Sequence, residues 1–245
     1  LKLSDFKKSV KDILPNLKQG LPLGLQFSVL AIGIVIMQGV VVNFDVDANG
    51  IMVANTPAQN GYGAGSKLFN VLISFYNGLG SAILVFIAQN YANIKRGCLQ
   101  ALVMVVVIHA LCFLIAGLCC INGAYQYLFM SADKVSAESI TYGNTFIFVD
   151  LANFSVVGFL IVVRSAVQGI CKSGYVLGAG IMELIARSLI CMFLPPLING
   201  GAITSSASLG AYIATCYGDP GAWFFASTLL LIPFIRYILK KKYKK

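Results

Sequence analysis

Charge is scarce in this chain. Only 11% of its 245 residues are charged, whereas 58% are hydrophobic. A soluble domain carries about 25% charged residues because its surface must face water. The apolar residues also form several blocks of about 18 residues or more with hardly a charge, which is the pattern of membrane-spanning helices. The composition therefore excludes a soluble globular domain and predicts an all-α integral membrane protein.

Motifs for chemistry are also lacking. The chain shows no Ser-His-Asp constellation, no paired carboxylates at enzyme spacing and no phosphate-binding loop. The seven cysteines include no C-x-x-C and lie mostly in apolar runs, so we interpret them as small membrane residues rather than disulfides or metal ligands. The single histidine, His109, is expected to be a hydrogen-bonding partner rather than a proton relay. The sequence predicts no enzyme, no catalytic residue, no metal site and no cofactor.

The apolar blocks predict six membrane spans. They cover about residues 20–44, 67–90, 99–121, 139–163, 175–198 and 209–239, and Gly218-Asp219-Pro220-Gly221 interrupts the last one. Each is long enough for a hydrocarbon core of about 30 Å at a rise of about 1.5 Å per residue. The first span is expected to begin after Pro15, with Pro22 in its first turn, and the glycine-rich segment 61–67 is placed on the outer face. Residues 1–19 then form a cytoplasmic linker, and residues 240–245 a basic cytoplasmic tail.

The basic residues predict the orientation. Fifteen of the 18 lysines and arginines, Arg164 among them, fall on one side of the six spans. The other side has only Lys67 and Lys134, and Arg187 lies inside a span. Positive charge is retained on the cytoplasmic face, so both termini are predicted to lie in the cytoplasm of a multi-pass protein of the cell inner (plasma) membrane. The formal net charge of +9 is explained by orientation and by anionic headgroups of the lipid bilayer, not by nucleic acid.

Polar side chains inside the spans are candidate functional residues, because they are costly at membrane depth. The candidates for a substrate or ion pathway are Gln26, Ser28, Gln38, Asn77, Asp150 and Asn153. Helix packing and the lining of a cavity are both open for the three on the first span. Asp150 has no cation near it in sequence, so it is either a coupling-ion site or a residue close to the outer interface.

Glu183 and Arg187 form the sharpest pair of charges, in the segment IMELIARSL. A spacing of four places both on one face of a helix, close enough to neutralise each other. We predict an ion pair that fixes helix packing. A proton- or cation-responsive switch is the alternative, although a carboxylate bonded to arginine titrates poorly near neutral pH.

Several segments occur together in one order along the chain. They are GLPLGLQFSVLAIGIVIMQ, GYGAGSKL, FNVLISFYNGLGSAILVFIAQNYAN, RSAVQGICKS, MELIARS and DPGAW. In this order they resemble the second half of a multidrug and toxic compound extrusion (MATE) transporter. The resemblance implies one six-helix lobe of a twelve-helix transporter, whose partner is a preceding N-terminal six-helix lobe. It also implies export of organic cations or other amphipaths by alternating access, in exchange for Na⁺ or H⁺.

The chain departs from that family at its ion ligands. The first span has no acidic residue where some members carry one, and the aspartate of others would fall near Val157, about two turns from Asp150. That ligand is therefore not transferred to Asp150. Two alternatives stay open: a truncated lobe that does not transport, and a lipid-linked oligosaccharide flippase of the same superfamily. A flippase is expected to carry more cationic residues facing its cavity, and the sequence offers only Arg187. The chain is expected to be part of a longer protein.

Overall fold

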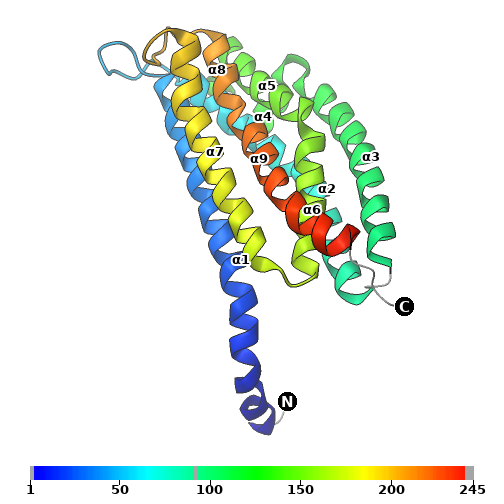
Figure 1. The fold of residues 1–245 in the computed structure, drawn as a ribbon. Coiled ribbons are helices and arrows are strands. Elements are labelled where there is room, and N and C mark those ends of the chain that lie inside the picture. Colours follow the sequence, from blue (N-terminus) through cyan, green and yellow to red (C-terminus); the bar gives the residue numbers. More distant parts are fainter. Residues whose placement is uncertain (1–2, 91–92, 241–245) are drawn as a thin grey trace.

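The computed structural model describes residues 3–90 and 93–240, with side chains from residue 13 onward. Figure 1 shows the helical bundle. Four long helices build most of it: α1 (Leu3–Asn43), α2 (Pro57–Gln89), α3 (Ile94–Cys120) and α7 (Ser173–Asn199). Two broken stretches complete it, namely α5 (Ala137–Ala152) with α6 (Phe154–Gly169), and α8 (Leu209–Cys216) with α9 (Gly218–Pro233) and the π-helix η4 (Phe234–Leu239). The short helices η2 (Ile121–Gly123), α4 (Gln126–Phe129) and η3 (Ala132–Lys134) connect α3 to α5.

The helices are long and apolar enough for a multi-pass membrane protein. Within the described residues, five helical stretches could cross a membrane by length and composition, and the number is six if the bent pair α5–α6 is one span. Their outer faces expose large apolar side chains, such as Val106 at 65% and Leu197 at 77%. Such faces are suited to lipid rather than water. The predicted all-α membrane fold agrees with this architecture.

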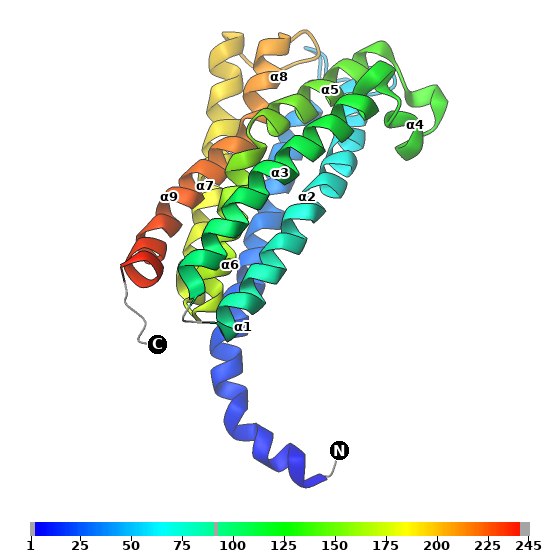
Figure 2. The ribbon, with the colours of Figure 1, turned by 90° about the vertical axis from the view of Figure 1, so that its right-hand side faces the viewer.

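Two helices begin earlier than the sequence pattern predicted. The helix α1 begins at Leu3 and contains both Pro15 and Pro22, so neither proline marks its start. Each proline removes one backbone hydrogen bond, but the turns on both sides continue. Figure 2 shows the N-terminal part of α1 extending beyond the rest of the bundle. The helix α2 begins at Pro57, and the glycine-rich segment 61–67, predicted to lie on the outer face ahead of a span starting at residue 67, is helical.

The early start of α2 has a local cause. Proline is favoured in the first helical turn, where its missing N–H needs no acceptor. The buried carboxylate of Asp45 accepts hydrogen bonds from the backbone N–H groups of Ala58 at 2.9 Å and Gln59 at 2.8 Å. In the same loop, a hydrogen bond from the backbone N–H of Ile51 lowers the pKa of the Asp47 carboxyl. These contacts order the segment that leads from α1 into α2.

Replacing Asp45 by alanine is expected to lower the free energy of unfolding by about 1–2 kcal/mol, because the first amides of α2 lose a charged acceptor. Thermal unfolding of the purified chain in detergent checks this. The variant Asp45→Asn keeps one acceptor and should lose less, and the exposed Asp133→Asn is the matched control. Equal stability of Asp45→Ala and Asp133→Asn would contradict the capping role.

Two breaks interrupt the remaining spans. The chain bends by 54° between α5 and α6 at Asn153, which the sequence did not predict. The Asn153 side chain donates to the carbonyl oxygen of Val149 at 2.9 Å, so it holds the end of α5. The helices α8 and α9 are divided at Tyr217, one residue before the predicted interruption.

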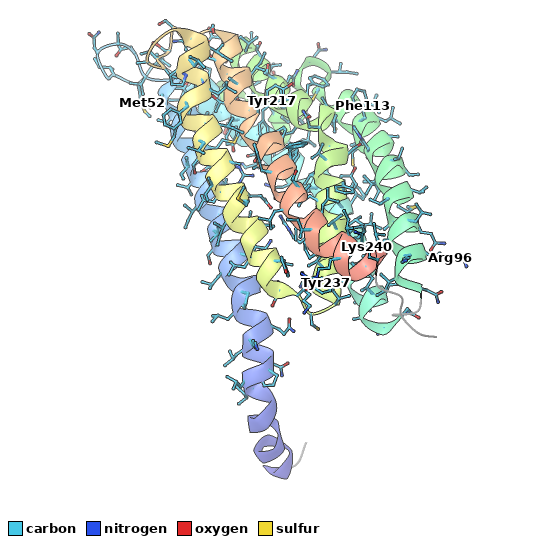
Figure 3. The ribbon with its side chains drawn as sticks, in the orientation of Figure 1. Met52, Arg96, Phe113, Tyr217, Tyr237 and Lys240 are labelled. Atoms are coloured by element: carbon cyan, nitrogen blue, oxygen red, sulfur yellow. The ribbon has the colours of Figure 1, made fainter. Side chains whose placement is uncertain are left out.

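The first residues of α1 and the last residues of η4 point toward the same end of the bundle. Figure 1 shows the start of α1, the α6–α7 turn and the end of η4 together at this end, which we call the basal end. Figure 3 shows Arg96, Tyr237 and Lys240 there, whereas Met52 and Tyr217 lie toward the opposite end. That both termini lie on one side of a membrane stays a prediction, as does the assignment of this side to the cytoplasm.

Candidate functional site

A cavity of about 240 Å³ lies among α1, α2, α5, α6, α7 and α9, and it is open on the side where Phe27 and Ile34 are exposed. Its wall is mostly apolar and aromatic, but charged and polar side chains from four helices also line it. They are Ser66, Asn70 and Asn77 of α2, Arg164 of α6, Glu183 and Arg187 of α7, and Asp219 of α9. A concave, largely apolar site with a few convergent polar groups is the usual form of a small-molecule site.

Two ion pairs join the helices around this cavity. Arg164 of α6 pairs with Glu183 of α7, and Arg187 Nη2 of α7 lies 2.5 Å from Asp219 Oδ1 of α9. All four side chains are largely buried. The prediction that Glu183 and Arg187 pair with each other is therefore wrong. They do share α7 at a spacing of four, but each has an oppositely charged partner on a neighbouring helix, α6 or α9.

Glycines make room for the Arg187 guanidinium. A Cβ atom at Gly33 of α1 would lie 2.8 Å from Arg187 Nη1. At Gly218, the first residue of α9, a Cβ would overlap Cys191 Sγ and lie 3.6 Å from Arg187 Cγ. Small residues at these points let α1 and α9 approach α7 closely. The position of the guanidinium therefore depends on the packing of three helices.

Asp150 is buried close to these charges. Its side chain is fully inaccessible, and neither carboxyl oxygen has a hydrogen-bond partner among the described residues. It interacts electrostatically with Asp219 and Arg187. Arg187 Nε and Nη1 likewise lack partners within the described part of the chain. A buried carboxyl group without a partner is costly unless it is protonated or binds a cation. The arrangement thus places one titratable group beside a preformed ion pair.

Aromatic rings form another part of the cavity wall. Trp223 of α9 stacks on Phe69 of α2 with ring centroids 5.9 Å apart and an interplanar angle of 7°. Tyr62 of α2 contacts Phe146 of α5 edge to face, with centroids 4.8 Å apart. All four rings line the cavity. These rings give the wall a large apolar surface, and the faces of aromatic rings attract positive charge.

The structure separates the predicted pathway residues. Asn77 lines the cavity. Asp150 does not line it, but interacts electrostatically with Asp219 and Arg187, which do. Gln26 is buried against α7, where a Cβ at Gly180 would lie 2.7 Å from Gln26 Cγ. The other three, Ser28, Gln38 and Asn153, do not line the cavity. Ser28 and Gln38 are exposed, and the Ser28 hydroxyl donates to the Gly24 carbonyl oxygen at 3.3 Å. Asn153 holds the end of α5.

Sequence reasoning missed two of the charged residues of the cavity. Arg164 was counted among the basic residues flanking the spans, but it lies within α6 and its side chain is only 16% exposed. Fourteen rather than fifteen basic residues therefore support the orientation. Asp219 was noted only as part of a kink. An acidic side chain within an apolar run was a signal that could have identified Asp219 as a site residue. Nothing near Arg164 in the sequence indicated that Glu183 is its partner. His109 forms a hydrogen bond with the hydroxyl of Ser155, as predicted.

No group of three or more His, Cys, Asp or Glu side chains that could hold a metal ion occurs within residues 13–90 and 93–240. Comparison of the chain with protein-family models, with curated proteins and with solved structures finds no match.

Proposed function

We propose that the chain is the C-terminal six-helix lobe of a MATE-type secondary active efflux transporter. It exchanges organic cations or other amphipaths against Na⁺ or H⁺. The observation that carries the proposal is Asp150, a fully buried carboxyl group without a hydrogen-bond partner beside a cavity that holds two ion pairs. Intramembrane acidic residues of this kind are typical of ion-coupled transport. The ordered sequence resemblance supports the family.

The charges suggest how the coupling ion and the substrate compete. The cluster contains three carboxyl groups (Asp150, Glu183 and Asp219) and two guanidinium groups, so its formal charge is −1 when all are ionised. A proton or Na⁺ at Asp150 removes that excess charge and weakens binding of a cationic substrate to the cavity. Release of the ion restores it. Such mutual exclusion is what an antiporter needs, provided that each ligand favours a different state of the two lobes.

The excess of carboxylates also weighs against the flippase alternative. Lipid-linked oligosaccharides carry phosphate, which needs cationic groups that are free to bind it. The structure adds Arg164 to Arg187 at the cavity, but both are paired with carboxylates. The cavity is thus better suited to a cation than to an anionic lipid.

The variant Asp150→Asn of the full-length transporter is expected to lose dye extrusion driven by a Na⁺ or H⁺ gradient by about tenfold or more, because an amide neither titrates nor carries charge. Efflux of a cationic dye from cells that lack their own efflux pumps measures this, with both gradients compared. Asp133→Asn, which removes an exposed carboxylate far from the cavity, is the control. Unchanged ion dependence in Asp150→Asn would remove the proposed coupling site.

Expression of the chain without its N-terminal lobe tests the remaining alternative. If transport needs both lobes, the chain alone should insert in the membrane and give no ion-dependent extrusion, whereas co-expression with the missing lobe restores it. Failure of the two-lobe protein to extrude any dye would favour a lobe that folds without transporting.

A further inference from the structure

A second cavity, of about 550 Å³, lies at the basal end where α1 leaves the bundle. The helix α1 forms one wall with Lys18 and Gln19, and the α6–α7 turn with the start of α7 forms the other with Lys172, Ser173 and Gly174. The Gln19 side-chain amide donates to the carbonyl oxygen of Cys171 at 3.4 Å, which joins the two walls. We call this space the basal cavity.

The basal cavity is surrounded by positive charge. Lys18 and Lys172 line it and are exposed. Lys172 Nζ lies 5.0 Å from the ring centroid of Tyr237, and Arg236 Cζ lies 5.3 Å from the same centroid, so a third cation is close. The carboxylates among residues 13–240 lie elsewhere: Asp45, Asp47, Asp133 and Glu138 in segments of the opposite end, and Asp150, Glu183 and Asp219 inside the bundle. No carboxylate among residues 13–90 and 93–240 therefore compensates the positive charge at this cavity.

The floor of the basal cavity offers hydrogen-bond donors. It is the N-terminus of the 27-residue helix α7, whose first amides, those of Ser173 and Gly174, have no acceptor within the helix. The Ser173 side chain lines the cavity but is only 6% exposed, and its hydroxyl has no hydrogen-bond partner among the described residues. A Cβ atom at Gly174 would meet nothing within 4 Å, so a ligand can approach the backbone there. Such a set of donors suits a phosphate group.

We propose that the basal cavity binds the phosphate of an anionic phospholipid headgroup. Lys18 and Lys172 neutralise its charge, and the Ser173 hydroxyl and the first amides of α7 donate hydrogen bonds to its oxygens. The surroundings favour a lipid over free phosphate. Leu17 and Leu21 of α1, on either side of Lys18 in sequence, are 55% and 62% exposed, so acyl chains can cover them. Tyr175 and Tyr237 provide the aromatic side chains expected at a membrane interface.

Native mass spectrometry of the purified chain in detergent tests the proposal with phosphatidylglycerol and phosphatidylcholine of identical acyl chains. Phosphatidylglycerol should be retained about tenfold more. Lys18→Gln/Lys172→Gln should reduce its retention to the phosphatidylcholine level, because the two lysines supply the charge that attracts the anionic headgroup. Ser173→Ala should reduce retention about threefold. Lys95→Gln/Arg96→Gln removes the same charge from the same end outside the cavity and should change nothing. Equal retention by the two double variants overturns the proposal.

The exposed thiol of Cys171 provides a second measurement that needs no variant. Cys171 lines the basal cavity, whereas the other six cysteines are buried or half-buried. Vesicles containing phosphatidylglycerol should slow maleimide modification of Cys171, and phosphatidylcholine vesicles should not. Inorganic phosphate is the third arm. Equal protection by millimolar phosphate would indicate a free-anion site and overturn the lipid proposal, as would the absence of protection by phosphatidylglycerol. None of these outcomes depends on transport activity.

Discussion

Asp219→Ala is expected to lower the free energy of unfolding by about 3–5 kcal/mol, the largest effect of any single substitution considered for this chain. The reason is that Asp219 is the carboxylate that pairs with Arg187 at 2.5 Å, in a site where the arginine side chain is only 5% exposed. Without it, the guanidinium stays buried and has lost its ion-pair partner, since Gly33 and Gly218 hold the neighbouring helices close around it. Removing one partner of a buried pair costs far more than the pair itself contributes.

The double variant Arg187→Met/Asp219→Leu distinguishes the cost of an unpaired buried charge from the net contribution of the ion pair to stability. It removes both charges and fills a similar volume, so we expect its stability within about 1 kcal/mol of the original chain. Trp223, the only tryptophan and a neighbour of Asp219 in the cavity wall, reports unfolding in detergent by its fluorescence. Asp133→Asn is the control for loss of an exposed carboxylate. If Asp219→Ala and the double variant lose equal stability, the buried charge is not the cause.

Gly61→Ala is expected to lower the free energy of unfolding by about 1–3 kcal/mol. A Cβ atom at Gly61 of α2 would overlap the carbonyl oxygen of Ser139 and lie 2.8 Å from the backbone nitrogen of Gly143, both on α5. Because these atoms belong to the backbone, no rotation of a side chain relieves the overlap. The two helices must separate, and the aromatic contact between Tyr62 and Phe146 separates with them.

Gly63→Ala provides the matched comparison, two residues further along the same helix. A Cβ atom there would meet nothing within 4 Å. Alanine favours the helix over glycine by up to about 1 kcal/mol, so this variant should be as stable as the original or more so. Thermal unfolding followed by circular dichroism compares the two. The same response to alanine at both positions would show that helix propensity, not close approach of α2 to α5, governs this region.

The membrane character and the all-α class were predictable from the sequence, whereas five spans, or six if α5–α6 is one span, stand against the six predicted. Long apolar blocks must satisfy their backbone groups internally, and only helices do so within a single segment. Basic residues precede, link or follow these blocks, as Lys2, Lys95, Lys172 and Lys240 do. The sequence therefore predicts that these four lysines share the cytoplasmic side of the membrane. Local rules failed at Pro15 and Pro22, because a proline in an otherwise strong helix removes one hydrogen bond without ending it.

The partners of the buried charges were decided only by the tertiary structure. The spacing of Glu183 and Arg187 placed both on α7, but it carried no information about which helices lie opposite. In the folded chain α6 brings Arg164 to Glu183, and α9 brings Asp219 to Arg187. The bend at Asn153 and the burial of Asp150 follow from the same packing. Charges in a low-dielectric interior pair with the nearest opposite charge in space, and helix packing, not position along the chain, sets that distance.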